Sequence, residues 1–471
     1  MNRRILSLCA FFCMALAAMA GGKAKYVFYF IGDGMGVNQV NGTETYMAAT
    51  EGRIGTAPLC FAQFPVAGLV TTFSASNGIT DSAAGGTALA TGHKTKNGAI
   101  GVTADLSAPV QSVAAAAKAE GMAVGIATSV SIDHATPASF YAHVKDRGMY
   151  HQIGKDLIAA GFDFYAGSDF LQPENKELSG DQTLYDQCEK AGYTIARGYK
   201  DYQAKAGSAS KMLLLQTEAA SRKDRTALPY AIDRKDGDMT LQDITRAAID
   251  FLSKKDADGF FLMVEGGKVD WACHSNDAAA AFREVIDTDE AVKVAYEFYK
   301  QHPDETLIVI TADHETGGIV LGAGKVELHF DVLKNQRQSA EAFSRMIAAL
   351  HQSQGEGFTW EFVRQQLQES FGFWSQIPLD EKETAQLKKA YEDFCEGVAK
   401  DNRTLYASEN VIAGTARQLM ARKAMVSWES DEHSNGYVPV FAIGAGAEKF
   451  TGRIDNTEIP KKIADAAGYD F

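Results

Sequence analysis

The amino-acid sequence predicts an α/β protein whose mostly parallel central β-sheet is flanked by helices on both faces. Short, apolar and often β-branched runs recur along the chain, and segments with a helical spacing of apolar residues lie between them. Polar residues gather directly after these runs. Because ligands bind beyond the carboxyl ends of parallel strands, this edge of the sheet is where we expect a functional site.

Five apolar runs are the expected strands, at residues 26–31, 122–128, 259–264, 306–311 and 438–443. The first run ends in Gly-Asp-Gly-Met-Gly, which indicates a buried strand that stops at a tight turn. Helical patterns between the runs include residues 109–120 and 241–254.

Two stretches interrupt this alternation. Residues 155–230 carry only weak strand and helix signals, whereas residues 325–423 are more clearly helical. In the second stretch Asp380 and Glu383 resemble a capping box, and apolar residues then follow at helical spacing. We therefore expect residues 21–324 and 424–471 to form the α/β core and residues 325–423 to form a helical insertion, or cap.

The N-terminus has the features of a secretory signal peptide, which we assign to residues 1–20. Arg3 and Arg4 precede an apolar run at 5–17, and Ala18-Met19-Ala20 supplies a small-x-small cleavage pattern. The run is too short to span a bilayer, and no other segment is apolar for long enough. These features predict an exported protein, periplasmic or secreted, without a membrane span.

The formal net charge of −14 argues against a nucleic-acid-binding or anionic-membrane surface. An anionic substrate would then need local positive charge from another source, and bound metal ions provide it. The cysteines beyond the signal peptide have no CxxC spacing, so a zinc finger is not expected, and their pairing stays open. They are Cys60, Cys188, Cys273 and Cys395.

Carboxylates and imidazoles recur at the ends of the expected strands. These side chains suit Zn²⁺, and carboxylates with hydroxyl oxygens suit Mg²⁺. Polar surface loops also collect such residues, but a buried strand end holds several carboxylates only where a cation compensates their charge. The candidate ligands are Asp33, Glu265, Asp270, His274, Asp313, His314 and His433.

Ser82 stands at the expected start of a helix of small residues that ends near Thr91-Gly92. Backbone N–H groups at such a position bind anions, and the helix dipole favours ionisation of the serine. Taken alone, Ser82 would be interpreted as a helix N-cap. The chain has no GxSxG elbow around it, so a serine activated by a metal fits better than a hydrolase triad.

Six motifs, in this order, make the chain resemble the alkaline phosphatase family over nearly its whole mature length. They are IGDGMG, TDSAAGGTALATG, HATPASFYAHVKDR, MVEGGKVDWACH, TADHETGG and DEHSNG. The resemblance implies an alkaline phosphatase-like fold and hydrolysis of small-molecule phosphate monoesters through a phosphoserine on Ser82. It also implies two Zn²⁺ ions, one Mg²⁺ ion and a homodimer.

The family's roles carry over residue by residue. The resemblance implies a first zinc on Asp270, His274 and His433, and a second zinc on Asp33, Asp313 and His314, with Ser82 as a further ligand. It implies magnesium on Asp33, Thr136 and Glu265. Arg147 matches the arginine that grips two phosphate oxygens, a role that a guanidinium fork suits. His134 and Trp271 stand at positions that vary within the family, close to the magnesium and the phosphate respectively.

The alternatives fall into two classes, related enzymes and a non-catalytic binding protein, and the sequence favours both of them less. A sulfatase needs a Cys/Ser-x-Pro-x-Arg motif that Ser82-Ala83-Ala84 lacks, and a phosphodiesterase lacks the third metal site that Thr136 and Glu265 would build. A cofactor-independent phosphoglycerate mutase, from the same metal-hydrolase superfamily as the alkaline phosphatases, is a further enzymatic alternative. A degenerate family member that binds phosphate or metal without turnover is the non-enzymatic one, and the filled catalytic positions argue against it.

Overall fold

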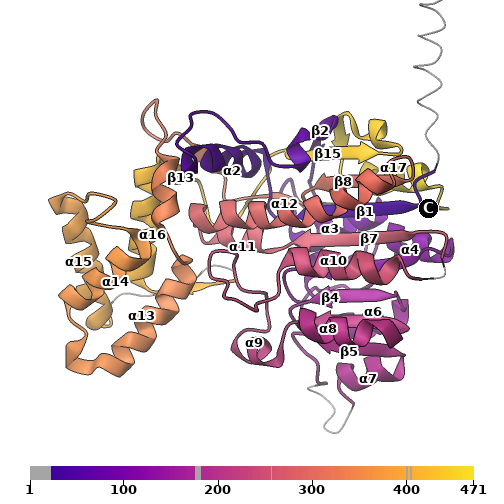
Figure 1. The fold of residues 1–471 in the computed structure, drawn as a ribbon, viewed down its shortest axis with the longest axis horizontal. Helices are drawn as coiled ribbons and strands as arrows, with labels where there is room; N and C mark the ends of the chain where they lie inside the picture. The colour runs from indigo at the N-terminus through magenta and orange to yellow at the C-terminus, as the bar shows by residue number, and fades with distance from the viewer. Residues whose placement is uncertain (1–22, 176–181, 256, 399–400, 404–405) are drawn as a thin grey trace, which may run out of the picture.

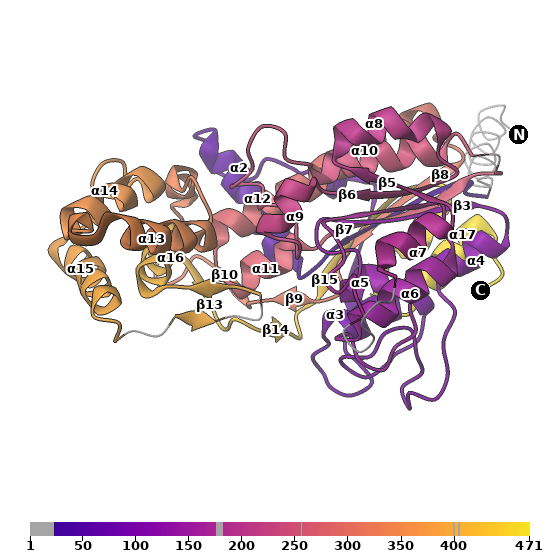
Figure 2. The ribbon, with the colours of Figure 1, turned by 90° about the horizontal axis from the view of Figure 1, so that it is seen from below.

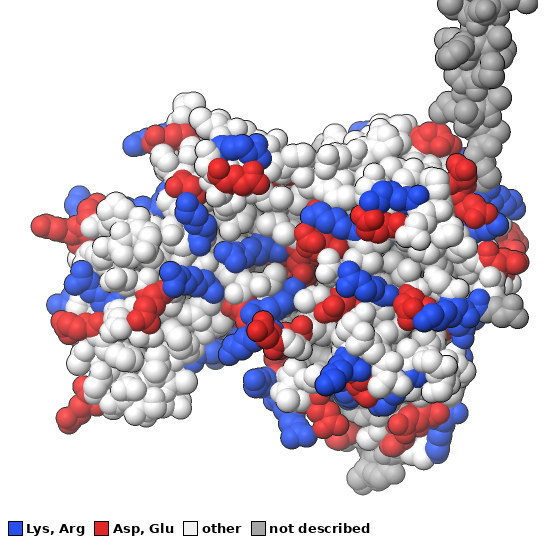
Figure 3. Space-filling view, in the orientation of Figure 1, with Lys and Arg blue, Asp and Glu red and all other residues white. Residues whose placement is uncertain are grey.

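A computed structural model of the chain describes residues 23–175, 182–255, 257–398, 401–403 and 406–471. The predicted signal peptide, 1–20, lies outside the described residues. Within the described part of the chain, no helix combines the length and the apolar character needed to cross a bilayer. Figure 3 shows acidic and basic side chains interspersed over one face of the molecule.

A ten-stranded sheet forms the centre of the molecule (Figure 1). Nine strands run in one direction, and β15 alone is antiparallel to its neighbours β2 and β8. The prediction of a mostly parallel sheet is therefore confirmed. In spatial order the strands are β16 Gly452–Asp455, β2 Val66–Thr71, β15 Val438–Gly444, β8 Thr306–Thr311, β1 Tyr26–Gly32, β7 Phe260–Gly266, β3 Ala123–Thr128, β4 Phe164–Gly167, β6 Lys211–Leu215 and β5 Tyr193–Arg197.

The strands at the middle of the sheet are continuous apolar runs because helices cover both of their faces. All five expected strands are present, each within two residues of its expected ends. The stretch 155–230, which seemed to interrupt the pattern, instead supplies β4, β5 and β6. These strands have only four or five residues, too few for a clear periodic signal.

Helices pack on the two faces of the sheet (Figure 2). The helices α10 and α12 contact β1, β3 and β7 from one side, and α4, α5 and α17 lie on the other side with α3. Outside residues 325–423 the helices are α2 Val37–Thr50, α3 Ser82–Thr91, α4 Val113–Ala119, α5 Ala135–Ala138, α6 Tyr150–Ala160, α7 Leu184–Lys190, α8 Tyr199–Lys205, α9 Glu218–Lys223, α10 Leu241–Leu252, α11 Lys268–His274, α12 Ala278–Gln301 and α17 Glu458–Ala467.

Within residues 325–423, four helices pack against one another at one end of the molecule (Figure 1). The third of them begins with the expected capping box: Asp380 accepts from the backbone of Glu383, and the Glu383 carboxylate accepts from the backbone of Asp380. The helices are α13 Ala340–Gln354, α14 Trp360–Phe371, α15 Glu381–Cys395 and α16 Val411–Ala424.

Two carboxylates of the α/β part, the buried Asp277 and the half-buried Asp233, bind the start of this helical segment. Asp277 accepts from the side-chain amide of Gln336 and from the backbone N–H of Ala340, and Asp233 accepts from the backbone and hydroxyl of Ser339. Because Ser339 and Ala340 begin α13, both acids also lie at the positive end of the helix dipole. The first helix of the segment is therefore held firmly against the sheet domain.

Candidate active site

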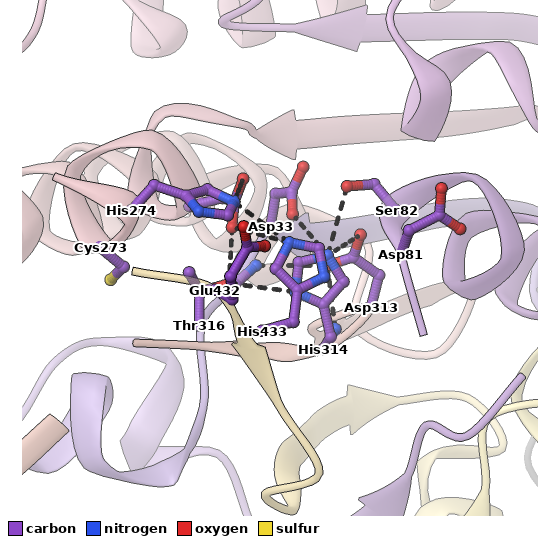
Figure 4. A network of polar contacts seen from close by, with 12 residues as sticks. Asp33, Asp81, Ser82, Cys273, His274, Asp313, His314, Thr316, Glu432 and His433 are labelled. Carbon is purple, nitrogen blue, oxygen red and sulfur yellow. Dashed lines mark hydrogen bonds and ion pairs between the residues drawn. The ribbon is translucent and has the colours of Figure 1, made fainter. Parts of the chain in front are cut away.

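The polar residues predicted at the strand ends converge on one edge of the sheet (Figure 4). Asp33 directly follows β1, Glu265 is the second-last residue of β7, and Asp313-His314 follow β8 after a single alanine. The strands β7 and β8 both pair with β1, which brings these residues side by side. All four are fully buried.

Asp33, Asp313 and His314 form the first cluster. Nε2 of His314 lies 3.3 Å from Oδ1 of Asp33 and 3.3 Å from Oδ2 of Asp313. One ligand atom of each residue lies within 4.8 Å of the others. The spacing is that of side chains arranged around a common centre.

Asp270, His274 and His433 form the second cluster. Helix α11 puts Asp270 and His274 one turn apart, with Nε2 of His274 3.3 Å from Oδ2 of Asp270. The short pairing of β14, His433–Ser434, with β9, Glu315–Thr316, brings in His433 from the far end of the chain. Its Nε2 lies 3.6 Å from Oδ1 of Asp270 and 3.2 Å from Nε2 of His274.

The outer nitrogens of these two histidines fix their tautomers. Nδ1 of His274 faces the backbone carbonyl of Asp431 at 2.5 Å, and Nδ1 of His433 faces that of Thr80 at 2.8 Å. A carbonyl only accepts, so each ring carries a proton on Nδ1 and turns its Nε2 inward. The two Nε2 atoms lie 3.2 Å apart, close enough for both to bind one cation.

A third cluster adjoins the first. Asp33, His134 and Glu265 offer ligand atoms within 4.8 Å of one another, and Oγ1 of Thr136 lies 3.5 Å from Oδ2 of Asp33. The hydroxyl of Thr128 donates to the Glu265 carboxylate. Thr128 was missed by the sequence reasoning, since a threonine at the end of a buried strand carries no distinct signal.

The charge in this region fits bound cations. At this edge of the sheet, four buried carboxylate oxygens accept no hydrogen bond from any described residue: Asp33 Oδ1, Glu265 Oε1, Asp270 Oδ2 and Asp313 Oδ2. Burial, and next the Asp313 carboxylate, raises the pKa of Asp33 well above its usual range, and burial raises the pKa of Glu265 to about 7. Divalent cations would satisfy the free oxygens and keep the acids ionised.

Ser82 is the first residue of α3, as the sequence predicted. The N-cap is Asp81, whose carboxylate accepts from the backbone N–H of Ala84 at 3.0 Å, so the alternative of Ser82 as a mere cap is wrong. The Ser82 hydroxyl is fully buried and lies 3.2 Å from Nε2 of His314. The neighbouring Gly85 allows α3 to approach this closely, since a Cβ there would lie 3.0 Å from the Asp313 carbonyl.

Arg147 reaches the same place from the loop after α5. Its Nη1 donates to Asp81 at 3.3 Å, and its Nη2 donates to the hydroxyl of Tyr406 at 3.1 Å. Nη2 also faces Nε2 of His134 at 3.2 Å. Burial, and next the Arg147 guanidinium, lowers the pKa of His134 to about 3, so this histidine is neutral and its Nε2 can accept.

Trp271 lines the same cavity as Arg147. It is 5% exposed, its indole N–H has no partner among the described residues, and its ring stacks on Tyr406 with centroids 4.5 Å apart. Arg147, Trp271, Tyr406 and His433 all border one cavity of about 770 Å³. The cavity is large enough for a small ester beside the Ser82 helix.

The sequence reasoning missed four residues that support the site: Asp81, Thr128, Thr316 and Tyr406. Thr316 donates to Oδ1 of Asp270 at 2.5 Å and so orients a carboxylate of the second cluster. Asp81 could have been recognised from its position one residue before the expected helix. Cys273, by contrast, is buried against Gln39 and points away from the clusters, as expected for a packed thiol (Figure 4).

The fold and the site together define a class, the metal-dependent hydrolases. The alkaline phosphatase family model matches residues 24–469, and the chain belongs to this family. Alkaline phosphatase 3 of Bacillus subtilis is 33% identical over 454 residues, which cover 95% of this chain and 90% of that protein.

Solved structures agree with this assignment. A cold-active alkaline phosphatase from a psychrophilic Shewanella species matches with a TM-score of 0.78 at 28% identity, over 94% of this chain and 99% of that one. The alkaline phosphatase of Thermus thermophilus matches with a TM-score of 0.77 at 27% identity, over 96% of this chain and 93% of that one.

Proposed function

We propose that this protein is an alkaline phosphatase that hydrolyses phosphate monoesters to an alcohol and inorganic phosphate through a phosphoserine on Ser82. The observation that carries the proposal is the position of the Ser82 hydroxyl. It lies at the N-terminus of α3, 3.2 Å from His314 of the carboxylate–imidazole clusters. The cavity of about 770 Å³ next to the start of this helix is bordered by Asp81 and Arg147.

We assign the metal ligands as follows, on the donor types and on the free oxygens described above. A first zinc would take Asp270, His274 and His433. A second zinc would take Asp33, Asp313 and His314 together with Ser82. Magnesium would take Asp33, Thr136 and Glu265, with His134 beside them. A solved structure of a variant of the TAB5 alkaline phosphatase, 26% identical to this chain, has magnesium bound.

When bound, these cations would supply positive charge to the phosphoryl oxygens and favour the ionised form of the serine. The covalent chemistry takes place on Ser82. Ser82 forms a bond from Oγ to phosphorus as the bond to the ester oxygen breaks, and the alcohol leaves. Water then attacks the phosphoserine, the bond from Oγ to phosphorus breaks, and phosphate leaves.

Arg147 supplies the preference for monoesters in this proposal. A monoester dianion presents several unsubstituted oxygens to a guanidinium fork, whereas a diester presents fewer and carries less charge. The backbone N–H groups at the start of α3 add a second set of donors on the same side as Ser82. Together they orient the phosphoryl group for attack by the serine.

Three further parts of the proposal concern the whole chain. We assign residues 21–324 and 424–471 to the catalytic core and residues 325–423 to a helical cap beside the cavity, which the position of Tyr406 at the cavity supports. We also propose export after removal of residues 1–20, and a homodimer, the latter from the family alone.

One experiment separates this function from its rivals. Purified protein is assayed with p-nitrophenyl phosphate, bis-p-nitrophenyl phosphate and p-nitrophenyl sulfate, each before and after chelation and after return of zinc and magnesium. The proposal predicts metal-dependent hydrolysis of the monoester far above the other two. Preferred hydrolysis of the diester or the sulfate would overturn it, as would metal binding without turnover.

A further inference from the structure

Tyr406 approaches the site from the helical segment, between the fifth and the sixth motif of the sequence. It lies between two short antiparallel strands, β11 Asn402–Arg403 and β12 Ser408–Glu409. No motif of the sequence includes it. Even so, its side chain borders the same cavity as Arg147 and Trp271.

The contacts of Tyr406 are made with the residues around the predicted phosphate position. Its hydroxyl accepts from Nη2 of Arg147 at 3.1 Å. Its ring lies parallel to Trp271, with an interplanar angle of 8°, and edge-on to His274 with centroids 5.4 Å apart. One side chain thus contacts the arginine, the tryptophan and a candidate zinc ligand.

The strand that follows Tyr406 is fixed to two helices. Glu409 is fully buried and forms an ion pair with Nε of Arg417 on α16 at 3.0 Å. Asn410 caps α16, and both its backbone and its side-chain amide bond to Ser344 on α13 at 2.9 Å. Because buried, paired groups hold this return strand, the position of Tyr406 is set by the packing of the helical segment.

The guanidinium of Arg147 is held from two directions. Asp81 accepts from Nη1, and Tyr406 and Nε2 of His134 lie at Nη2. The partners differ in charge: the Asp81 carboxylate offsets part of the positive charge, whereas the neutral hydroxyl of Tyr406 orients the group and leaves its charge available. An arginine fixed in this way loses less rotamer freedom when it binds a phosphate.

We propose that Tyr406 is a positioning residue of the phosphate site, which orients Arg147 through its hydroxyl and links the helical segment to substrate binding. The inference rests on the proposed function. It assigns the segment a direct part in binding, since the residue that orients the arginine comes from it.

The test compares Tyr406→Phe with the wild type in the zinc- and magnesium-loaded enzyme. The variant keeps the ring that stacks on Trp271 and removes only the hydroxyl. We expect the KM for p-nitrophenyl phosphate and the inhibition constant of inorganic phosphate to rise about threefold to tenfold, with a smaller change in kcat. Tyr391→Phe is the matched control, since its hydroxyl bonds to the Phe358 carbonyl at 2.8 Å within the same segment, and it should change neither constant.

A double-mutant cycle shows whether the effect runs through Arg147. In an Arg147→Ala background, Tyr406→Phe should have no further effect on phosphate inhibition. Equal constants for wild type and Tyr406→Phe would overturn the inference, as would an undiminished effect in the Arg147→Ala background. If Tyr406→Phe is poorly folded, Tyr406→Leu, which also lacks the hydroxyl, takes its place in both comparisons. A wild type without monoesterase activity would instead overturn the proposed function.

Discussion

The hydroxyl of Ser82 lies 3.2 Å from Nε2 of His314, although the two residues are 232 positions apart in the chain. The sheet explains this proximity, because α3 packs beside the end of β8, where Gly85 leaves room for the Asp313 carbonyl. The serine and the carboxylate–imidazole clusters therefore form one site, and the predictions below follow from their arrangement.

Removal of His433 should empty one metal site and spare the other. His433→Ala deletes the imidazole that faces His274, while the backbone pairing of β14 with β9 can persist. We expect the purified variant to lose about one equivalent of zinc and nearly all activity. Metal analysis checks this, with His351→Ala on α13 as the control. Loss of every metal, or of none, would show that His433 does not serve a separate site.

Arg147 should determine the choice between monoesters and diesters. Arg147→Ala removes a fork whose hydrogen bonds are charge-assisted, so kcat/KM for the monoester should fall about tenfold to a hundredfold. The diester rate should fall less, and the ratio between the two should narrow. Arg147→Lys keeps the charge without the fork and should recover only part of the ratio. The assignment fails if the ratio is the same in wild type and Arg147→Ala.

The helical segment 325–423 should affect which substrates the enzyme accepts in the cavity beside Arg147. Replacement of α14 and α15 by a short Gly/Ser linker keeps α13, α16 and the strand that holds Tyr406. We expect unchanged metal content and altered relative rates on bulky and small phosphates, measured on a panel of monoesters. Loss of folding, seen by circular dichroism, would mean that these helices belong to the core.

Product phosphate should bind less tightly beside Trp271 than beside a cationic residue at this position, because an indole supplies one N–H and no charge. Trp271→Lys introduces a cation at the cavity wall and should tighten phosphate inhibition by about 1 kcal/mol if it acts through solvent. The ring also packs against Tyr406, so Trp271→Phe, which keeps an aromatic face there, is the control and should not tighten inhibition. Equal inhibition constants in the wild type and the lysine variant, with metals intact in both, would make Trp271 a packing residue only.

The sequence predicted those parts of the molecule that leave a local pattern. The strands β1, β7 and β8 are long apolar runs, so the sheet and the acids after it were expected at the right positions. The helix start at Ser82 followed from the small residues of α3, although its cap is Asp81.

Other parts depend on tertiary contacts that no local pattern encodes. The edge strands β4, β5 and β6 are short and become strands by pairing with their neighbours. Thr316 lies inside the TADHETGG motif, but nothing in the motif points to its partner, and Tyr406 is an ordinary aromatic residue outside the motifs. They gain a role only because the fold brings one to Asp270 and the other to Arg147.

The central claim is that Ser82 carries the phosphoryl group during turnover. The most direct test is to incubate the metal-loaded enzyme with a ³²P-labelled monoester, quench it in acid and map the label by peptide mass spectrometry. We expect phosphate on Ser82, and neither label nor measurable turnover in Ser82→Ala with its fold and metals retained. Label on any other residue, or turnover by Ser82→Ala at the wild-type rate, would contradict the account.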